Sequence, residues 1–192
     1  MKFRYIILLL TFLIRPGFLP APDLPPDSNP FLLLDKMRNE ILKNDKVRYH
    51  LNYKQFKKTL AKYESNCNWK EYNRFGFIGK YQFGKSALDA TGYGHINFES
   101  FKSNPYLFSE KDQEIAMDVL LNINETVMQK SINRYVGFIM LDSIRITRPG
   151  ILAAAHLAGP ANVKEFLDSY GQKNARDRMG TNISDYLNIF SR

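Results

Sequence analysis

The sequence predicts a mainly helical α+β domain that covers residues 31–192. Three observations support this fold class. After residue 31, most apolar residues recur at the three- and four-residue spacing of helices. Residues 68–84 are the exception, because their aromatic residues and three glycines follow no helical period. Strands do not alternate with helices along the chain, so a parallel sheet is not expected.

Helical spacing begins at Phe31 and returns over residues 53–63. This second segment predicts that Glu64 stands at or near a helix C-terminus. Residues 68–84 are expected to form a loop with short extended pieces, and a short helix is expected over 84–91.

Ser109 opens the longest predicted helix, with Asp112 three positions later in an approximate capping box. Helical spacing predicts a single buried face for this helix, made of Ala116, Val119, Leu120, Ile123 and Val127. Further helices are expected over residues 148–157, 161–170 and 181–190.

The N-terminus predicts export. Lys2 and Arg4 precede a ten-residue apolar run, Tyr5–Ile14, which is too short for a spanning helix of roughly 20 residues and fits a secretory signal. We therefore assign residues 1–21 to a signal peptide and expect a periplasmic or secreted protein. The alternative is a retained N-terminal membrane tether. Residues 22–30 are proline-rich and predict a stiff linker before the domain.

The charge, cysteine and histidine content indicates which binding partners, disulfides and cofactors to expect. The net charge is +8, which suits an anionic polymer or surface, but no run of five Lys or Arg residues indicates a nucleic-acid arm. Cys67 is the single cysteine, so no internal disulfide forms, and we expect it to be buried. The three histidines show no metal-ligand spacing, so neither a metal nor another cofactor is expected.

Residues 79–86, GKYQFGKS, match the phosphate-loop pattern G-x-x-x-x-G-K-[ST]. A phosphate loop needs a buried strand before it and a neighbouring strand that supplies an Asp. The preceding NRFGFI offers at most four strand residues, although VGFIMLD at 136–142 resembles a strand ending in Asp142. We expect no nucleotide, and loss of ATP binding on Lys85→Ala would be the signature of the alternative.

Several short motifs occur together in a recognisable order. Glu64-Ser65 is followed by the GKYQFG block at 79–84 and then by LAAAHLAGP at 152–160. These residues resemble the lytic transglycosylase branch of the lysozyme-like superfamily, which carries an E-S pair, a G-x-Y/M-Q segment and an A-A-Y-N-A-G-P turn. The resemblance covers roughly residues 53–170, and the ending GTNISDYLNIFS looks like the tail of related cell-wall enzymes. It implies a lysozyme-like domain that cleaves the MurNAc-GlcNAc β-1,4 bond of peptidoglycan.

Glu64 is the expected catalytic acid and base. Cleavage of a glycosidic bond needs a carboxyl group that is still protonated near neutral pH. Aromatic residues nearby are expected to shield Glu64 and raise its pKa, namely Tyr63, Trp69, Phe75, Phe77, Tyr81 and Phe83. Hydrolysis usually requires a second carboxylate, and none is evident, although Glu71, Asp89 and Asp142 cannot be placed. The resemblance implies that the sugar's own acetamido group and 6-hydroxyl replace it.

The resemblance also implies the substrate-binding residues. Ser65 would orient Glu64 or the acetamido group, while Tyr81 and Gln82 would line the glycan groove and Gly79 would let the backbone approach the sugars. Core packing of Tyr81 and a loop hydrogen bond of Gln82 are equally weighted alternatives.

His156 marks a departure from the family pattern, which usually has Tyr at this position with its hydroxyl toward the catalytic Glu. We expect a neutral His156 in the site, acting as a donor, because an imidazolium would lower the pKa of that Glu. The alternative is a core histidine with satisfied hydrogen bonds.

Peptidoglycan glycan strands are the expected partner of a monomeric enzyme. A hydrolysing muramidase and a non-catalytic glycan-binding module of the same fold remain the alternatives.

Overall fold

The computed structural model describes residues 30–176 and 180–191. The expected signal peptide and most of the expected linker, residues 1–29, lie outside the described residues. The chain divides into two units, Met1–Arg38 and Asn39–Arg192, and the second contains the core and the candidate site. Within the described ranges, no helix combines the length and apolarity needed to cross a membrane.

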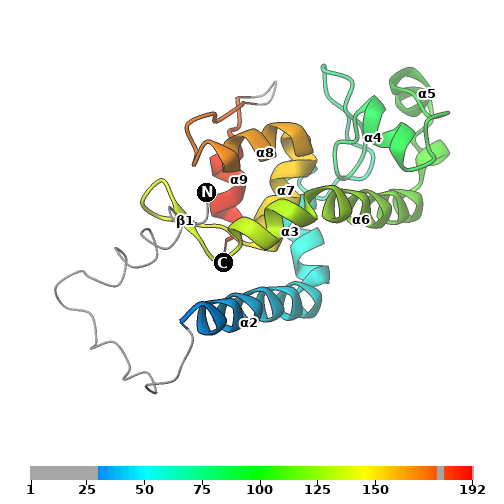
Figure 1. The fold of residues 1–192 in the computed structure, drawn as a ribbon. Coiled ribbons are helices and arrows are strands. Elements are labelled where there is room, and N and C mark those ends of the chain that lie inside the picture. Colours follow the sequence, from blue (N-terminus) through cyan, green and yellow to red (C-terminus); the bar gives the residue numbers. More distant parts are fainter. Residues whose placement is uncertain (1–29, 177–179, 192) are drawn as a thin grey trace. The chain divides into compact units, whose positions relative to one another are not determined.

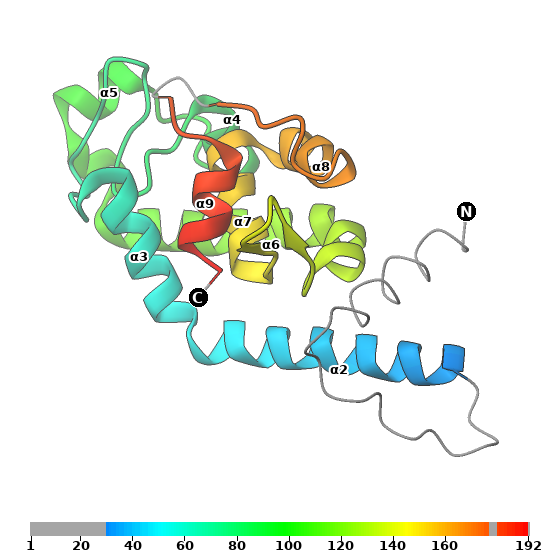
Figure 2. The same ribbon diagram turned by 90° about the vertical axis from the view of Figure 1, so that its left-hand side faces the viewer.

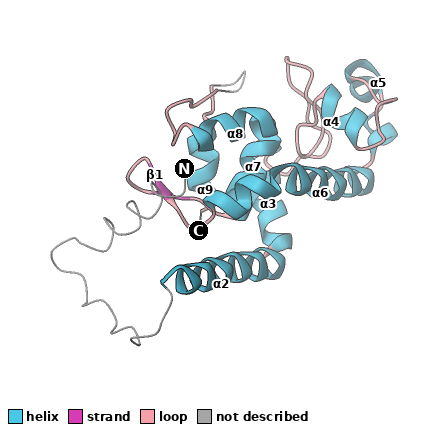
Figure 3. Cartoon of the chain, in the orientation of Figure 1, coloured by secondary structure: helices cyan, strands magenta, loops and turns pink. Residues whose placement is uncertain are grey.

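The described residues are mainly helical, with one small sheet, as the sequence predicts (Figures 1 and 3). Strands β1 (Ile139–Met140) and β2 (Ile144–Arg145) form an antiparallel pair. The helices are α2 (Pro30–Leu51), α3 (Tyr53–Ser65), α4 (Lys85–Ala90), α5 (Phe98–Ser103), the 3₁₀ helix η1 (Pro105–Phe108), α6 (Glu110–Tyr135), α7 (Arg148–Ala158), α8 (Pro160–Asp168) and α9 (Ile183–Ile189).

Helix α3 ends where the sequence predicts, with Glu64 in its last turn. Asn66 and Cys67 adopt left-handed φ values of 53° and 64°, and the N–H of Cys67 caps the carbonyl of Ala61. These two residues turn the chain outward and leave Cys67 exposed as a free thiol. The expectation of a buried Cys67 is therefore wrong.

Helix α6 begins at the predicted capping box, because the side chains of Ser109 and Asp112 cap each other's backbone N–H. Its buried face differs from the predicted one. Ala116 and Leu120 are buried as expected, but Val127 is 61% exposed and Val119 38% exposed. Buried residues instead follow the row Gln113, Ala116, Met117, Leu120, Leu121, Asn124, Met128, Ser131, Ile132 and Tyr135.

Residues 68–84 form a loop with isolated antiparallel bridges, Tyr72 to Ile78 and Ile78 to Phe83, as expected. A phosphate loop would need a strand here within a parallel sheet. Among the described residues the sheet has two short antiparallel strands, and Ile139 in β1 is 52% exposed. Lys85 forms an ion pair with Asp89. The parallel-sheet setting that a phosphate loop needs is therefore not found in the described part of the chain.

Helix α7 is the centre of the second unit and packs against α6, α8 and α9 (Figure 2). Its compact residues Ala153, Ala154 and Ala155 are buried, which lets the neighbouring helices approach closely. Thr147 accepts from the N–H of Gly150 and caps the start of this helix.

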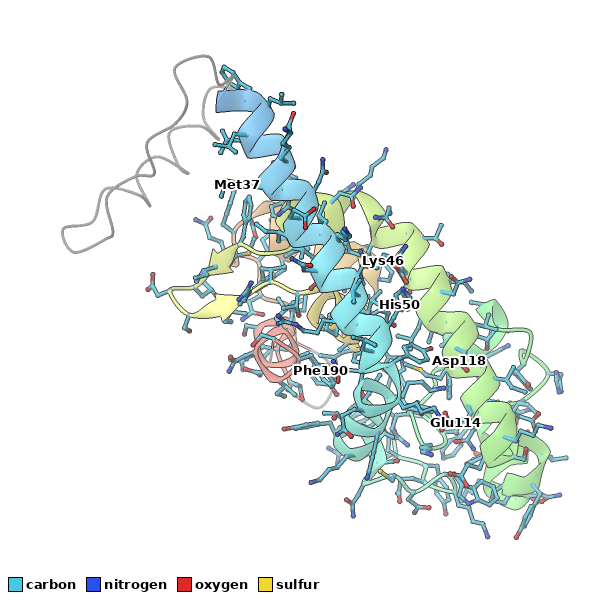
Figure 4. All side chains as sticks on the ribbon, turned by 90° about the horizontal axis from the view of Figure 1, so that it is seen from below. Met37, Lys46, His50, Glu114, Asp118 and Phe190 are labelled. Carbon is cyan, nitrogen blue, oxygen red and sulfur yellow. The ribbon has the colours of Figure 1, made fainter. Side chains whose placement is uncertain are left out.

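A partly buried ionic network joins α3, α6 and the 68–84 loop. Lys57 on α3 contacts Glu114 at 2.7 Å and Asp118 at 2.5 Å. Lys80 in the loop contacts Glu114 and Glu110, each at 2.9 Å. Figure 4 shows Glu114 and Asp118 on the side of α6 that faces α3. Glu114 is therefore the carboxylate on which the two lysines converge.

This network predicts acid sensitivity of the fold. Burial raises the pKa of Glu114, but hydrogen bonds from Lys57, Lys80 and Tyr81 outweigh it, so the pKa lies below its ordinary value of 4.5. The resulting stabilisation is present above about pH 4.5 and is lost as pH falls through the lower folded-state pKa. Glu114→Gln should cost about 1–2 kcal/mol at pH 7, moderated by partial exposure, and progressively less toward pH 3.

The measurement is the free energy of unfolding by urea at each pH. Glu165→Gln is the matched control, because Glu165 forms an ion pair with Lys173 at 3.6 Å but is 62% exposed. It should change stability by less than about 0.5 kcal/mol. An equal loss for Glu114→Gln at pH 7 and pH 3 would contradict the role of the network.

Candidate functional site

Glu64 lies where three helices meet. Its side chain, in the last turn of α3, is 12% exposed. The hydroxyl of Tyr186, from α9, donates to Oε1 of Glu64 at 2.6 Å. Nε2 of His156, from α7, stands 3.9 Å from the same oxygen. The carboxyl group is thus mostly withdrawn from solvent and faces polar side chains rather than open water.

Tyr186 is the residue that the sequence did not reveal as part of the site. It is 5% exposed, on a helix whose start is fixed by a reciprocal cap between Asn182 and Asp185. Packing of α9 against α7 brings it to Glu64 although 122 positions separate the two residues. The only sequence signal was a tyrosine on the predicted helix at 181–190, within the tail that looked like those of related enzymes.

His156 does reach the site, but its hydrogen bond goes elsewhere. Nε2 lies 2.7 Å from the backbone carbonyl of Tyr81, and a carbonyl only accepts, so the proton is on Nε2 and points to that oxygen. Nδ1 is buried and has no hydrogen-bond partner among the described residues. Among the described residues, the hydroxyl of Tyr186 donates to Glu64, and His156 does not donate to it as expected.

Ser65 links the end of α3 to the 68–84 loop instead of contacting Glu64. Its hydroxyl donates to the carbonyl of Lys80 at 2.7 Å. The next carbonyl along the chain, that of Tyr81, receives His156. Two consecutive carbonyls of the loop therefore hold the residue after Glu64 and the imidazole beside it.

Gln113 on α6 fixes the loop segment 79–81 by hydrogen bonds to the backbone. It is fully buried, and its Oε1 accepts the N–H of Lys80 at 2.6 Å. Its Nε2 donates to the carbonyls of Trp69 and Phe108, each at 2.8 Å. One side chain thereby joins three backbone segments and sets where residues 79–81 lie.

The side chains of Tyr81 and Gln82 are engaged in the protein interior and the loop. Tyr81 is 1% exposed and its hydroxyl donates to Glu114 at 2.8 Å, which matches the core-packing alternative. Gln82 donates to the carbonyl of Gly79 at 2.9 Å and accepts from Asn73 at 2.8 Å, which matches the loop alternative. Tyr81 contributes its carbonyl to the site, not its ring.

Gly79 is required by the approach of Gln113. Its φ is +78°, and a Cβ there would stand 2.5 Å from Oε1 of Gln113. Gly76 has a similar φ of +86°, but a Cβ at that position would meet nothing within 4 Å. The two glycines thus share a backbone conformation and differ in what surrounds them.

Some of the aromatic residues expected to shield Glu64 have ring contacts with other residues. Tyr63 is 56% exposed and its ring contacts Phe190, while Trp69 packs against Tyr106. Phe83 is fully buried and its ring stands edge-on to His156 at a centroid distance of 6.3 Å. Of these rings, that of Phe83 packs against a residue of the site, His156.

The three other carboxylates considered from sequence occupy different places. Glu71 is exposed and accepts from Asn68 at 2.9 Å, and Asp89 forms an ion pair with Lys85. Asp142 stands in the turn between β1 and β2 with a φ of 64°. Within the described ranges, no group of three His, Cys, Asp or Glu side chains has the arrangement of a metal site.

Two cavities of the second unit lie away from the Glu64 carboxyl and its contacts with Tyr186 and His156. One, of about 580 Å³, is lined by residues of η1, α6 and the loop, including Trp69 and Lys80. The other, of about 400 Å³, is lined by residues of α2, α3 and the end of α9, including Tyr49 and Phe190. Glu64 lines neither.

No known protein family, curated protein or solved structure matches the chain. Any functional assignment therefore depends on the sequence motifs and on the geometry around Glu64.

The contrast between the two glycines gives a test of how the loop is held. Gly76→Ala should cost about 1–2 kcal/mol, the strain of a left-handed residue. Gly79→Ala should cost roughly 2 kcal/mol more, because the new methyl group displaces Gln113 and frees the N–H of Lys80. Thermal unfolding of both variants provides the measurement. Equal losses would mean that Gln113 does not hold the segment.

Proposed function

We propose that the protein is a peptidoglycan lytic transglycosylase with a lysozyme-like fold and that Glu64 is its single acid and base. The observation that carries this proposal is the setting of the Glu64 carboxyl. It is mostly buried at the end of a helix, and it meets Tyr186 and His156 from two other helices. The order of the E-S, G-K-Y-Q and A-A-A-H-L-A-G-P motifs supports the same activity.

In the first step, Glu64 gives its proton to the oxygen that leaves when the C1–O bond of the sugar breaks. The acetamido group of the sugar stabilises the positive charge that develops at C1. In the second step, the 6-hydroxyl of the same sugar attacks C1 and gives its proton to Glu64. No water is consumed, the enzyme regains its starting protonation state, and the product carries a 1,6-anhydro end.

Tyr186 and His156 have separate parts in this proposal. The Tyr186 hydroxyl holds the Oε1 side of the Glu64 carboxyl and so sets how the group is presented to substrate. His156 holds the Tyr81 carbonyl and keeps the loop against α7.

Charge and the N-terminal sequence support peptidoglycan as the substrate. A net charge of +8 attracts an anionic wall polymer over a long range. The apolar run at 5–14 favours export to the compartment where that polymer lies. We propose the periplasm or the cell exterior as the location, with either a cleaved signal or a retained tether.

The central test is Glu64→Gln in full-length protein on purified cell-wall sacculi. Loss of the acid should lower cleavage at least about 100-fold. Glu71→Gln is the matched control, since Glu71 is an exposed carboxylate seven residues away, and it should retain wild-type activity. Mass spectrometry of the products distinguishes the reactions, because anhydro ends are lighter by one water than hydrolysed ends. Normal lysis by Glu64→Gln would refute the proposal, and hydrated ends would indicate a muramidase.

Tyr186→Phe tests whether the hydroxyl positions the acid. The ring stays in its buried place, so the fold should survive, while kcat should fall roughly tenfold with KM little changed because the carboxyl is less well oriented. Tyr63→Phe is the control, since Tyr63 is adjacent to Glu64 but 56% exposed. Equal activity of the two variants would remove Tyr186 from the mechanism.

A further inference from the structure

The larger cavity lies beside the segment that holds Ser65 and His156. It measures about 580 Å³ and is lined by Trp69, Lys80, Tyr106, Ser109, Glu110, Lys111 and Glu114. It is an open depression of the surface, and its volume lies in the range of small-ligand sites. Lys80 connects the two regions, because its carbonyl accepts from Ser65 while its side chain lines the cavity.

Two aromatic rings form one wall of this cavity and are held in place. Trp69 and Tyr106 pack edge to face, with centroids 5.4 Å apart. The ammonium of Lys70 lies 4.9 Å from one ring and 4.8 Å from the other, and it donates to the Tyr106 hydroxyl at 3.3 Å. Lys70 does not line the cavity, so it supports the rings from outside. Tyr106 is nevertheless 68% exposed, which core packing does not explain.

The charged groups of the cavity cancel. Lys80 and Lys111 provide two positive charges, and Glu110 and Glu114 provide two negative ones. Lys80 is already paired with both glutamates at 2.9 Å. A site for phosphate or another anion would present surplus positive charge. The lining instead offers neutralised donors and acceptors beside flat apolar rings, which suits a neutral ligand with many hydroxyl groups.

We propose that this cavity is a saccharide-binding site, separate from Glu64, in which a sugar ring stacks on Trp69 and Tyr106 while its hydroxyl and amide groups bond to Glu110, Glu114 and Lys111. The choice among saccharides rests on the proposed function, which favours a β-1,4-linked N-acetylated glycan. The site would hold one strand of the wall next to the loop that forms part of the candidate active site.

Trp69 is the single tryptophan of the chain and therefore reports on this cavity directly. The probe is the β-1,4-linked tetramer of N-acetylglucosamine, titrated into full-length Glu64→Gln protein so that it is not cleaved. We expect a saturable change in tryptophan fluorescence. Adding Tyr106→Ala should weaken the fitted affinity about five- to tenfold, whereas Tyr106→Phe, which keeps the ring, should restore most of it.

Tyr72→Ala is the matched control. Tyr72 is also exposed, pairs edge-on with Phe98 and has Lys102 over its ring, but it does not line the cavity. It should leave the titration unchanged, and circular dichroism should show all variants folded. No saturable change, or equal affinities for Tyr106→Ala and Tyr72→Ala, would overturn the inference. If the wild type binds the saccharide but does not cleave the cell wall, this site is supported and the proposed function is refuted. If it cleaves the wall but shows no fluorescence change, the proposed function is supported and this site is refuted.

Discussion

The buried amide of Gln113 is the interaction on which the candidate site depends. A glutamine with no exposed surface must satisfy its hydrogen-bonding groups inside the protein, and this one does so with the backbone of Lys80, Trp69 and Phe108. These partners belong to the loop after α3 and to η1, which have little regular structure of their own. The amide of Gln113 therefore fixes these backbone segments by hydrogen bonds, as a β-sheet does in other folds. Gly79 permits it, because no other residue leaves room for Oε1.

Gln113 also affects the position of the candidate site, because it fixes the loop whose backbone carbonyls bind Ser65 and His156. Once Lys80 is fixed, its carbonyl receives Ser65, and the next carbonyl receives His156. The end of α3 and the middle of α7 are thereby tied to the same two peptide groups. Glu64 lies between these two helices, and the hydroxyl of Tyr186 on α9 donates a hydrogen bond to it. These contacts tie three helices and one loop together around the Glu64 carboxyl.

Features that depend on local sequence were predictable, and features that depend on packing were not. The end of α3 and the cap of α6 follow from spacing and from Ser109 with Asp112, and both predictions are confirmed. The buried face of α6 was partly misjudged, since Val127 fits the apolar period yet lies 61% exposed. The hydrophobic period predicts the spacing of buried residues along a helix. Which side of the helix is buried depends on the helices that pack around it. Tyr186 and the Tyr81 carbonyl were not predicted for the same reason, because tertiary packing alone brings Tyr186 to Glu64 and the Tyr81 carbonyl to His156.

Two partly buried glutamates have different hydrogen-bonding partners in this fold. Glu114 receives Lys57, Lys80 and the Tyr81 hydroxyl, which together hold its pKa below the ordinary value. Such a group is ionised at neutral pH and has no proton to give. Glu64 instead accepts from the phenolic hydroxyl of Tyr186, and Nε2 of His156 lies 3.9 Å from the same carboxyl oxygen. Tyr81 is shared between these environments, because its hydroxyl bonds to the first and its carbonyl to the histidine beside the second. Lys80 makes a second link, because its ammonium pairs with Glu114 and its carbonyl accepts from Ser65, so a change at the α3–α6 network would reach the candidate site through the backbone of both residues.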